Sequence, residues 1–137
     1  MFREDFVWGV ASSAYQVEGT DAADGRGACV WDMFAADGRV FEHQNADTSC
    51  DHMHHYKEDI ALMRHLGIRA YRFSLNWARI LPEGTGRVNE KAIAMYRDMI
   101  LTMKENGITP YLTLFHWEFP QALYERGGWQ NPDVVQW

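Results

Sequence analysis

Short apolar runs alternate with amphipathic segments along this chain, and this alternation constrains the fold more than any other feature. Runs at 6–11, 68–77 and 109–117 lack helical spacing and contain many aromatic and β-branched side chains, which favours strands. Segments 51–66 and 89–106 repeat apolar side chains along one helix face and are followed by glycines, which favours helices. Strands that alternate with helices predict a parallel sheet with right-handed crossovers.

Two parallel-sheet architectures fit this order: a (β/α)8 TIM barrel and an open, doubly wound sheet. No G-x-G-x-x-G segment follows a predicted strand, which removes the main support for a dinucleotide-binding doubly wound sheet. A closed barrel takes eight strands and eight helices, typically about 250 residues. The chain has 137 residues. We therefore expect an incomplete α/β domain, with no internal boundary between residues 1 and 137.

Charge and composition exclude several classes of partner. The formal net charge is −6 with no basic run, so nucleic acid is disfavoured. No apolar stretch approaches the roughly 20 residues of a membrane helix. Arg3, Glu4 and Asp5 stand where a signal peptide has its apolar run, so a cytoplasmic location is expected. The 6 tryptophans suit a sugar or aromatic ligand, with core packing as the alternative.

Residues 19–50 are rich in glycine and aspartate and are predicted to form long loops, with one aromatic turn at 31–34. Loops of this size are uncommon unless they are functional. The later segments carry clearer signals, because Asn89 is an acceptable N-cap and residues 131–133 place proline at the first helical position. The helix after Asn89 is expected to bury Ile93, Tyr96, Ile100 and Met103.

Arg72 is the most unusual residue of the second predicted strand. Period-2 alternation places it with Ala70, Ser74 and Asn76 on one face, while Tyr71, Phe73, Leu75 and Trp77 occupy the other. A guanidinium at a mid-strand position needs a carboxylate partner if it is buried. Arg72 either pairs with a structural carboxylate or lies near an edge, or it orients a catalytic carboxylate and lowers its pKa.

The third predicted strand ends in His116, Trp117 and Glu118. Catalytic and binding residues of parallel barrels gather at the carboxyl ends of the strands. An imidazole beside an indole suits a donor and a platform for a polyhydroxylated ring, and base catalysis by His116 is the weaker reading. Glu118 precedes the predicted helical turn at 120–124, so the alternative is that it caps that turn.

Residues 50–55 contain enough ligand types for a metal site. His52 and His55 lie three residues apart on one predicted helix face, and His54 lies between them. However, the full H-E-x-x-H pattern is absent, and Asp51 also has a simpler use as an N-terminal helix carboxylate. A metal-dependent hydrolase is therefore only a third hypothesis, and no metal or other cofactor is expected.

Five segments resemble glycoside hydrolase family 1, which contains β-glucosidases and 6-phospho-β-glycosidases. They follow one another in the family's order and cover almost the whole chain. The segments are FVWGVASSAYQVEGT, GRGACVWDMF, DTSCDHMHHYKEDIALMRHLGI, AYRFSLNWARILPEGTGRVNE and PYLTLFHWEFPQALYERGGW.

The resemblance implies a (β/α)8 barrel, of which this chain is the first three strand–helix units, and hydrolysis of β-glycosides with retention of configuration. It implies that Gln16 and His116 hydrogen-bond hydroxyls of the glycone, the sugar that is cleaved off, and that Trp117 adds its indole N–H. It implies that Arg72 contacts the nucleophile carboxylate. Amide, imidazole and indole donors are chemically suited to a ring of hydroxyl groups.

The chain departs from the family pattern most strongly in its catalytic carboxylates. The acid/base glutamate belongs to a T-x-N-E-P segment after the third helix and the nucleophile to a much later E-N-G segment, so both are expected beyond Trp137. A retaining glycosidase needs both carboxyl groups, roughly 5–5.5 Å apart. We therefore expect the chain alone to be inactive. Asn76 and Glu118 also differ from the residues more usual in the family, a small residue and aspartate.

The expected substrate is a β-glucoside or an oligosaccharide, with glucose favoured as the glycone by family frequency. The alternative function is a non-catalytic sugar-binding or assembly module completed by another chain. In either case the open sheet edges and apolar surface predict a covering partner, either a C-terminal fragment or a second copy.

Overall fold

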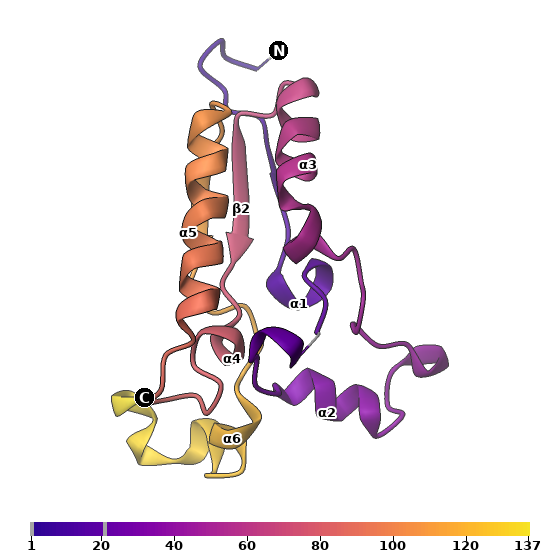
Figure 1. Cartoon of the computed structure of the whole chain (residues 1–137), viewed down its shortest axis with the longest axis vertical. Coiled ribbons are helices and arrows are strands. Elements are labelled where there is room, and N and C mark those ends of the chain that lie inside the picture. Colours follow the sequence, from indigo (N-terminus) through magenta and orange to yellow (C-terminus); the bar gives the residue numbers. More distant parts are fainter. Residues whose placement is uncertain (1, 21) are drawn as a thin grey trace.

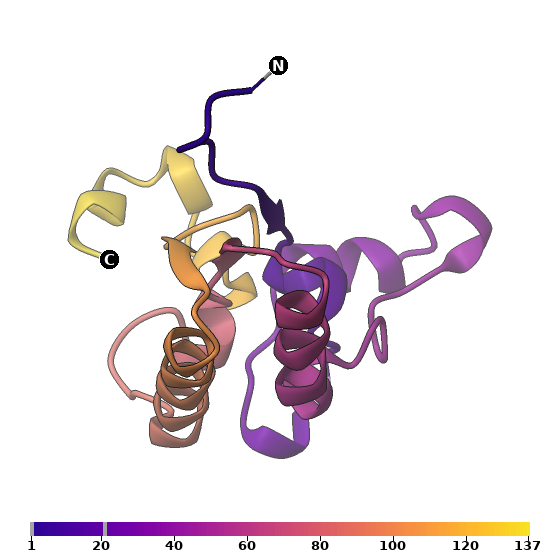
Figure 2. The same ribbon diagram turned by 90° about the horizontal axis from the view of Figure 1, so that it is seen from above.

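The computed structural model describes residues 2–20 and 22–137. Its centre is a parallel sheet in the order β1 (Gly9–Ala11), β2 (Ala70–Ser74), β3 (Thr109–Thr113). The long helices α3 (His52–His65) and α5 (Glu90–Glu105) connect these strands and lie on the same face of the sheet (Figures 1 and 2). The predicted succession of strands and helices is confirmed.

The shorter elements gather at the end of the sheet toward which β2 points (Figure 1). The short α-helices are α1 (Ala14–Val17), α2 (Val30–Ala36), α4 (Trp77–Ile80) and α6 (Gln121–Tyr124). The 3-10 turns are η1 (Ala22–Asp24), η2 (Phe41–His43), η3 (Gly128–Gln130) and η4 (Pro132–Gln136). The carboxyl ends of all three strands therefore lie beneath a layer of short helices and loops.

One apolar core fills the space between the sheet and the two long helices. Tyr71 and Phe73 of β2 are buried against it, as the period-2 alternation predicted, while Arg72 between them is exposed. The buried members of the core are Tyr56, Ile60, Tyr71, Phe73, Tyr96, Met99, Met103 and Ile108. The sheet is covered by helices on this face, and the opposite face of β2 and β3 carries exposed residues.

The predicted helix ends are largely confirmed. The Asn89 side chain accepts a hydrogen bond from the backbone N–H of Ala92, and Gly107 terminates α5 with a φ of 71°. Asn131 caps the last segment as predicted, although that segment is a 3-10 helix. Asp51 precedes α3 but makes no capping bond, because its carboxylate faces the imidazole of His54 at 2.6 Å.

Several expected boundaries and faces are wrong. The strand expected at 6–11 is only three residues long and exposed, because β1 is an edge strand paired with β2 alone in the described part of the chain. The second strand ends at Ser74, since Asn76 caps α4 by accepting from the N–H of Arg79. The turn expected at 31–34 is part of α2. Within α5, Ile93 is exposed and Met99 is buried instead.

Gly27 is expected to tolerate no side chain. A Cβ at this position would overlap the backbone carbonyl of Pro82, and the Gly27 N–H donates to the Ala78 carbonyl at 2.8 Å, so neither backbone can move away freely. Gly27→Ala should lower the free energy of unfolding by about 3 kcal/mol, measured by urea denaturation with tryptophan fluorescence. Gly67→Ala is the control. It meets no atom within 4 Å and should cost only about 1 kcal/mol for its left-handed backbone. Equal losses in the two variants would contradict the overlap.

Candidate active site

The segments that follow the three strands are tied together at the carboxyl end of the sheet. The N–H of Ala14, at the start of α1, donates to the Ser74 hydroxyl at the end of β2, at 2.7 Å. The N–H of Tyr15 donates to the Glu118 carboxylate in the turn after β3, at 2.8 Å. Both bonds come from adjacent residues of α1. The segments that follow β1 and β3 are therefore held together at the carboxyl end of the sheet.

Three of the candidate residues from the sequence lie at this end of the sheet. Gln16 belongs to α1 and is exposed, directly after Tyr15. His116 is half-buried, and its Nδ1 is buried without a hydrogen-bond partner among the described residues. Trp117 is 70% exposed and has a φ of 83°, a left-handed conformation that is rare for a bulky residue. Strained backbone of this kind clusters at ligand-binding sites.

Arg72 lies further back, in the middle of β2. It pairs in register with Ala11 on β1 and Tyr111 on β3, so it lies on the central strand and not at an edge. Its side chain is exposed on the face opposite α3 and α5 and forms no ion pair with any residue of 2–20 or 22–137. Within the described residues, Arg72 therefore neither lies at a sheet edge nor pairs with a structural carboxylate.

Glu118 is buried and does not cap α6, contrary to the expected alternative. The N-cap of α6 is Pro120, without a side-chain bond, and the carboxylate instead accepts the N–H of Tyr15. Burial raises the pKa of Glu118, while the N–H of Tyr15 opposes that effect. Its second oxygen, Oε2, has no hydrogen-bond partner within the described part of the chain.

The sequence did not predict a buried network of ion pairs and hydrogen bonds next to this end of the sheet. Arg79 of α4 contacts Glu18 through Nε at 3.1 Å, donates to the Gly19 carbonyl at 2.9 Å and pairs with Asp24. The Tyr96 hydroxyl donates to the other oxygen of Glu18 at 2.7 Å. Burial raises the pKa of Glu18 to about 7, against the opposing effects of Arg79 and Tyr96. The network fixes the C-terminal end of α1 to α4 and α5. An arginine between apolar residues in the sequence WARIL was the available signal.

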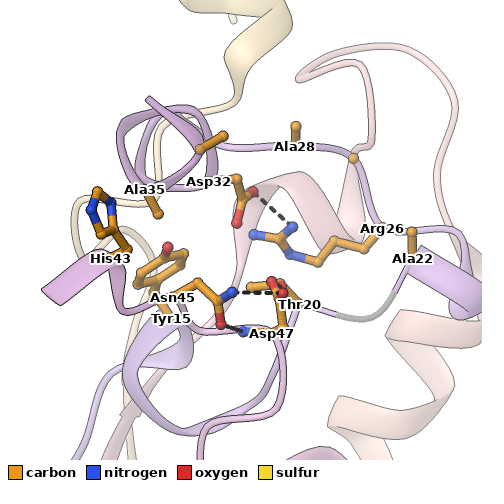
Figure 3. A pocket seen from close by; sticks show the side chains of 12 residues that line it. Tyr15, Thr20, Ala22, Arg26, Ala28, Asp32, Ala35, His43, Asn45 and Asp47 are labelled. Carbon is orange, nitrogen blue, oxygen red and sulfur yellow. Dashed lines mark hydrogen bonds and ion pairs between the residues drawn. The ribbon is translucent and has the colours of Figure 1, made fainter. Parts of the chain in front are cut away.

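A polar pocket of about 350 Å³ lies between α2 and the loop at 43–47, with Tyr15 of α1 in its lining (Figure 3). Arg26 and Asp32 lie side by side in its lining and form a 2.9 Å ion pair. Asn45 and Asp47 are hydrogen-bonded to each other on a second wall. Burial, reinforced by Asp32, raises the pKa of the Tyr15 hydroxyl to about 12, so this group remains a proton donor at neutral pH. The long loops at 19–50 thus form a defined wall beside the site.

The histidines at 52–55 are not gathered into one site. The rings of His52 and His54 contact Asp59 and Asp51, respectively, each at 2.6 Å. His55 contacts Glu58 at 3.4 Å. Within residues 2–20 and 22–137, no three His, Cys, Asp or Glu side chains are grouped closely enough to hold a metal ion. The geometry gives the metal-hydrolase hypothesis no support.

Glu105, Asn106 and Gly107 carry the letters of the family's E-N-G segment, although that segment was expected only beyond residue 137. They form the C-terminal end of α5, with Asn106 as its C-cap, directly before β3. This is the end of the sheet opposite Gln16 and His116, and Glu105 is exposed there. Glu105 therefore cannot act as the nucleophile of this site.

Residues 1–137 match the family model described as Glycosyl hydrolase family 1 over their whole length. The chain belongs to this family. It is 48% identical over 137 residues to Beta-glucosidase A of Thermotoga maritima, covering 99% of this chain and 31% of the relative. It is 44% identical to an aryl-phospho-beta-D-glucosidase of Bacillus subtilis, of which it covers 29%.

Solved structures agree with this assignment. The family 1 b-glucosidase from Thermotoga maritima superimposes with a TM-score of 0.95 and 48% identity, over 99% of this chain and 32% of that one. The same enzyme in complex with deoxynojirimycin gives the same TM-score, 0.95. The three strand–helix units are thus an open part of a (β/α)8 barrel, and the chain spans about a third of the length of these relatives. None of the described helices is both long and apolar enough to cross a membrane.

Proposed function

We propose that this family member supplies the glycone-binding part of a retaining β-glycoside hydrolase, with β-glucosides as its substrates. The observation that carries the proposal is the pair of adjacent bonds from Ala14 to Ser74 and from Tyr15 to Glu118. These bonds hold the segments that carry Gln16, His116 and Trp117 at the carboxyl end of the sheet. The resemblance of the whole chain to β-glucosidases supports the choice of substrate.

Each residue has a distinct role in this proposal. The Gln16 amide both donates to and accepts from neighbouring glycone hydroxyls, and the His116 imidazole shares that task. Trp117 offers its indole N–H and an exposed ring for the sugar. Hydrogen bonds to hydroxyls that strengthen in the transition state contribute to catalysis as well as to binding.

Arg72 is proposed to contact the nucleophile carboxylate, which lies beyond residue 137. A guanidinium beside that carboxylate keeps its pKa low, and an ionised carboxylate is the form that attacks the sugar. The acid/base glutamate also lies beyond residue 137. We therefore propose that residues 1–137 are the N-terminal part of a single barrel domain, inactive until the remaining strands supply both glutamates. A cytoplasmic location stays a prediction.

Exposed apolar side chains on the two outer strands, β1 and β3, favour a covering partner. Val10, Tyr111, Leu112 and Leu114 are all exposed large apolar residues of the strands or of the segment directly after β3. The C-terminal part of the barrel is the proposed cover. A non-catalytic module covered by another chain is the second candidate, and it differs in predicting that no carboxylate pair is ever supplied.

The proposal is tested with an aryl β-glucoside and two proteins. The polypeptide that the source cell makes from this gene should release nitrophenol and yield glucose with retained configuration. The purified 137-residue chain should release none above a contaminant control, because it lacks the carboxylate pair. Steady release by the short chain would contradict the assignment of both glutamates beyond residue 137. An inactive native polypeptide would favour the non-catalytic module.

A further inference from the structure

We propose that Glu118 is a positioning residue that sets the distance between Gln16 and the His116–Trp117 pair. The inference rests on the proposed function, because it concerns how the glycone-binding groups are held. Glu118 directly follows Trp117, and its carboxylate holds the residue directly before Gln16. One side chain thus joins two segments that are 103 residues apart in the sequence.

The burial of Glu118 shows that this link is not a surface contact. The residue is 1% exposed, and Oε1 accepts the Tyr15 N–H at 2.8 Å. Burying a carboxylate is costly unless it is hydrogen-bonded, and Oε2 has no partner among residues 2–20 and 22–137. A fold that merely needed to fill this space would do so at lower cost with an apolar side chain.

The backbone around Glu118 needs a restraint at this point. Trp117 is held at a φ of 83°, and the Phe119 N–H donates to the Trp117 carbonyl at 2.9 Å, which closes a tight turn centred on Glu118. Downstream, Val30 donates to the Phe119 carbonyl at 2.9 Å. These contacts anchor the exit of the turn to the start of α2. Among the described residues, the hydrogen bond of the Glu118 side chain is the only one that joins the turn to α1.

The length of the side chain also matters. Aspartate is one methylene shorter, so it would either lose the hydrogen bond from the Tyr15 N–H or draw α1 toward the turn. The length of the glutamate side chain thus helps to set the separation between the segments that carry Gln16 and His116. Because hydroxyl recognition depends on sub-ångström placement of donors, this separation acts on substrate binding and not only on folding.

The test uses kinetics of the native gene product with an aryl β-glucoside. Glu118→Ala and Glu118→Asp should each lower kcat/KM by about tenfold, mainly through KM. Glu118→Gln keeps an oxygen acceptor of the same length and should stay within about threefold of wild type. Glu125→Ala, which removes an exposed carboxylate just after α6, is the matched control and should change nothing measurable.

A double-mutant cycle separates positioning from simple stabilisation. If Glu118 acts through Gln16, then Glu118→Asp should have little further effect on kcat/KM once Gln16→Ala is present. Additive effects, or a Glu118→Gln loss as large as that of Glu118→Asp, would overturn the inference while leaving the proposed function intact. A wild-type gene product without β-glucosidase activity would overturn both.

Discussion

Replacing Arg79 with methionine is expected to lower the free energy of unfolding by about 3–5 kcal/mol. The guanidinium is 2% exposed and is the cationic partner of Glu18, which is itself 3% exposed. Without it, the Glu18 carboxylate stays buried with the Tyr96 hydroxyl as its remaining side-chain donor. Glu18 must then either remain charged without a cationic partner or take up a proton, since burial already raises its pKa to about 7, and both outcomes cost stability. Urea unfolding of the chain, followed by tryptophan fluorescence, measures it.

A control variant and a double variant test whether the loss comes from the buried ion pair. Arg64→Met removes an exposed arginine that has one 3.3 Å hydrogen bond to Asn106, and it should cost about 0.5 kcal/mol or less. Adding Glu18→Leu to Arg79→Met removes the stranded carboxylate and should recover a large part of the loss, since Asp24 is half-exposed and stays solvated. A loss below about 1 kcal/mol for Arg79→Met, or no recovery in the double variant, would contradict the importance of the network.

Gln16→Ala is expected to reduce kcat/KM of the native gene product on an aryl β-glucoside by about 100-fold or more. The amide is exposed at the carboxyl end of the sheet and contributes a donor and an acceptor from one side chain. Its removal leaves glycone hydroxyls of the bound substrate without protein partners, and a site built to hydrogen-bond hydroxyls loses much more than a surface hydrogen bond when one partner is removed. Steady-state kinetics provides the measurement, and folding should be unaffected because the side chain is not part of the core.

Gln130→Ala provides the matched control for that variant. Gln130 is also an exposed glutamine in a short helical turn, in η3, and its loss should leave kcat/KM within about twofold of wild type. A Gln16→Ala variant that retained wild-type kcat/KM would remove Gln16 from the glycone site.

The fold could be predicted from the sequence wherever local periodicity decides the structure. Tyr71 and Phe73 alternate with Arg72 because side chains in a strand alternate between faces, and Asn89 caps α5 because its amide reaches the first free N–H groups. These are short-range effects. The exposure of β1 was not predictable in this way, because burial of a strand depends on its neighbours and β1 has only β2 among the described residues.

The sequence suggests candidate site residues but not the contacts that hold them. Gln16, His116 and Trp117 could be named from motifs, whereas the contacts of Glu118 with Tyr15 and of Arg79 with Glu18 join residues 103 and 61 positions apart. No local pattern encodes such pairs. A carboxylate just before a helix commonly caps it, which is why capping of α6 is the local alternative for Glu118, but its carboxylate accepts the N–H of Tyr15 in α1 instead.

If these 137 residues form a working glycone-binding third of a family 1 barrel, they should function in place of the same third of a related enzyme. The most direct test is a hybrid in which they replace the matching third of Beta-glucosidase A of Thermotoga maritima, to which they are 48% identical. The measurement is nitrophenol release from an aryl β-glucoside. We expect the hybrid to have a kcat/KM within about tenfold of that of the parent enzyme, a difference of about 1.4 kcal/mol in transition-state stabilisation. A folded hybrid without activity would contradict it.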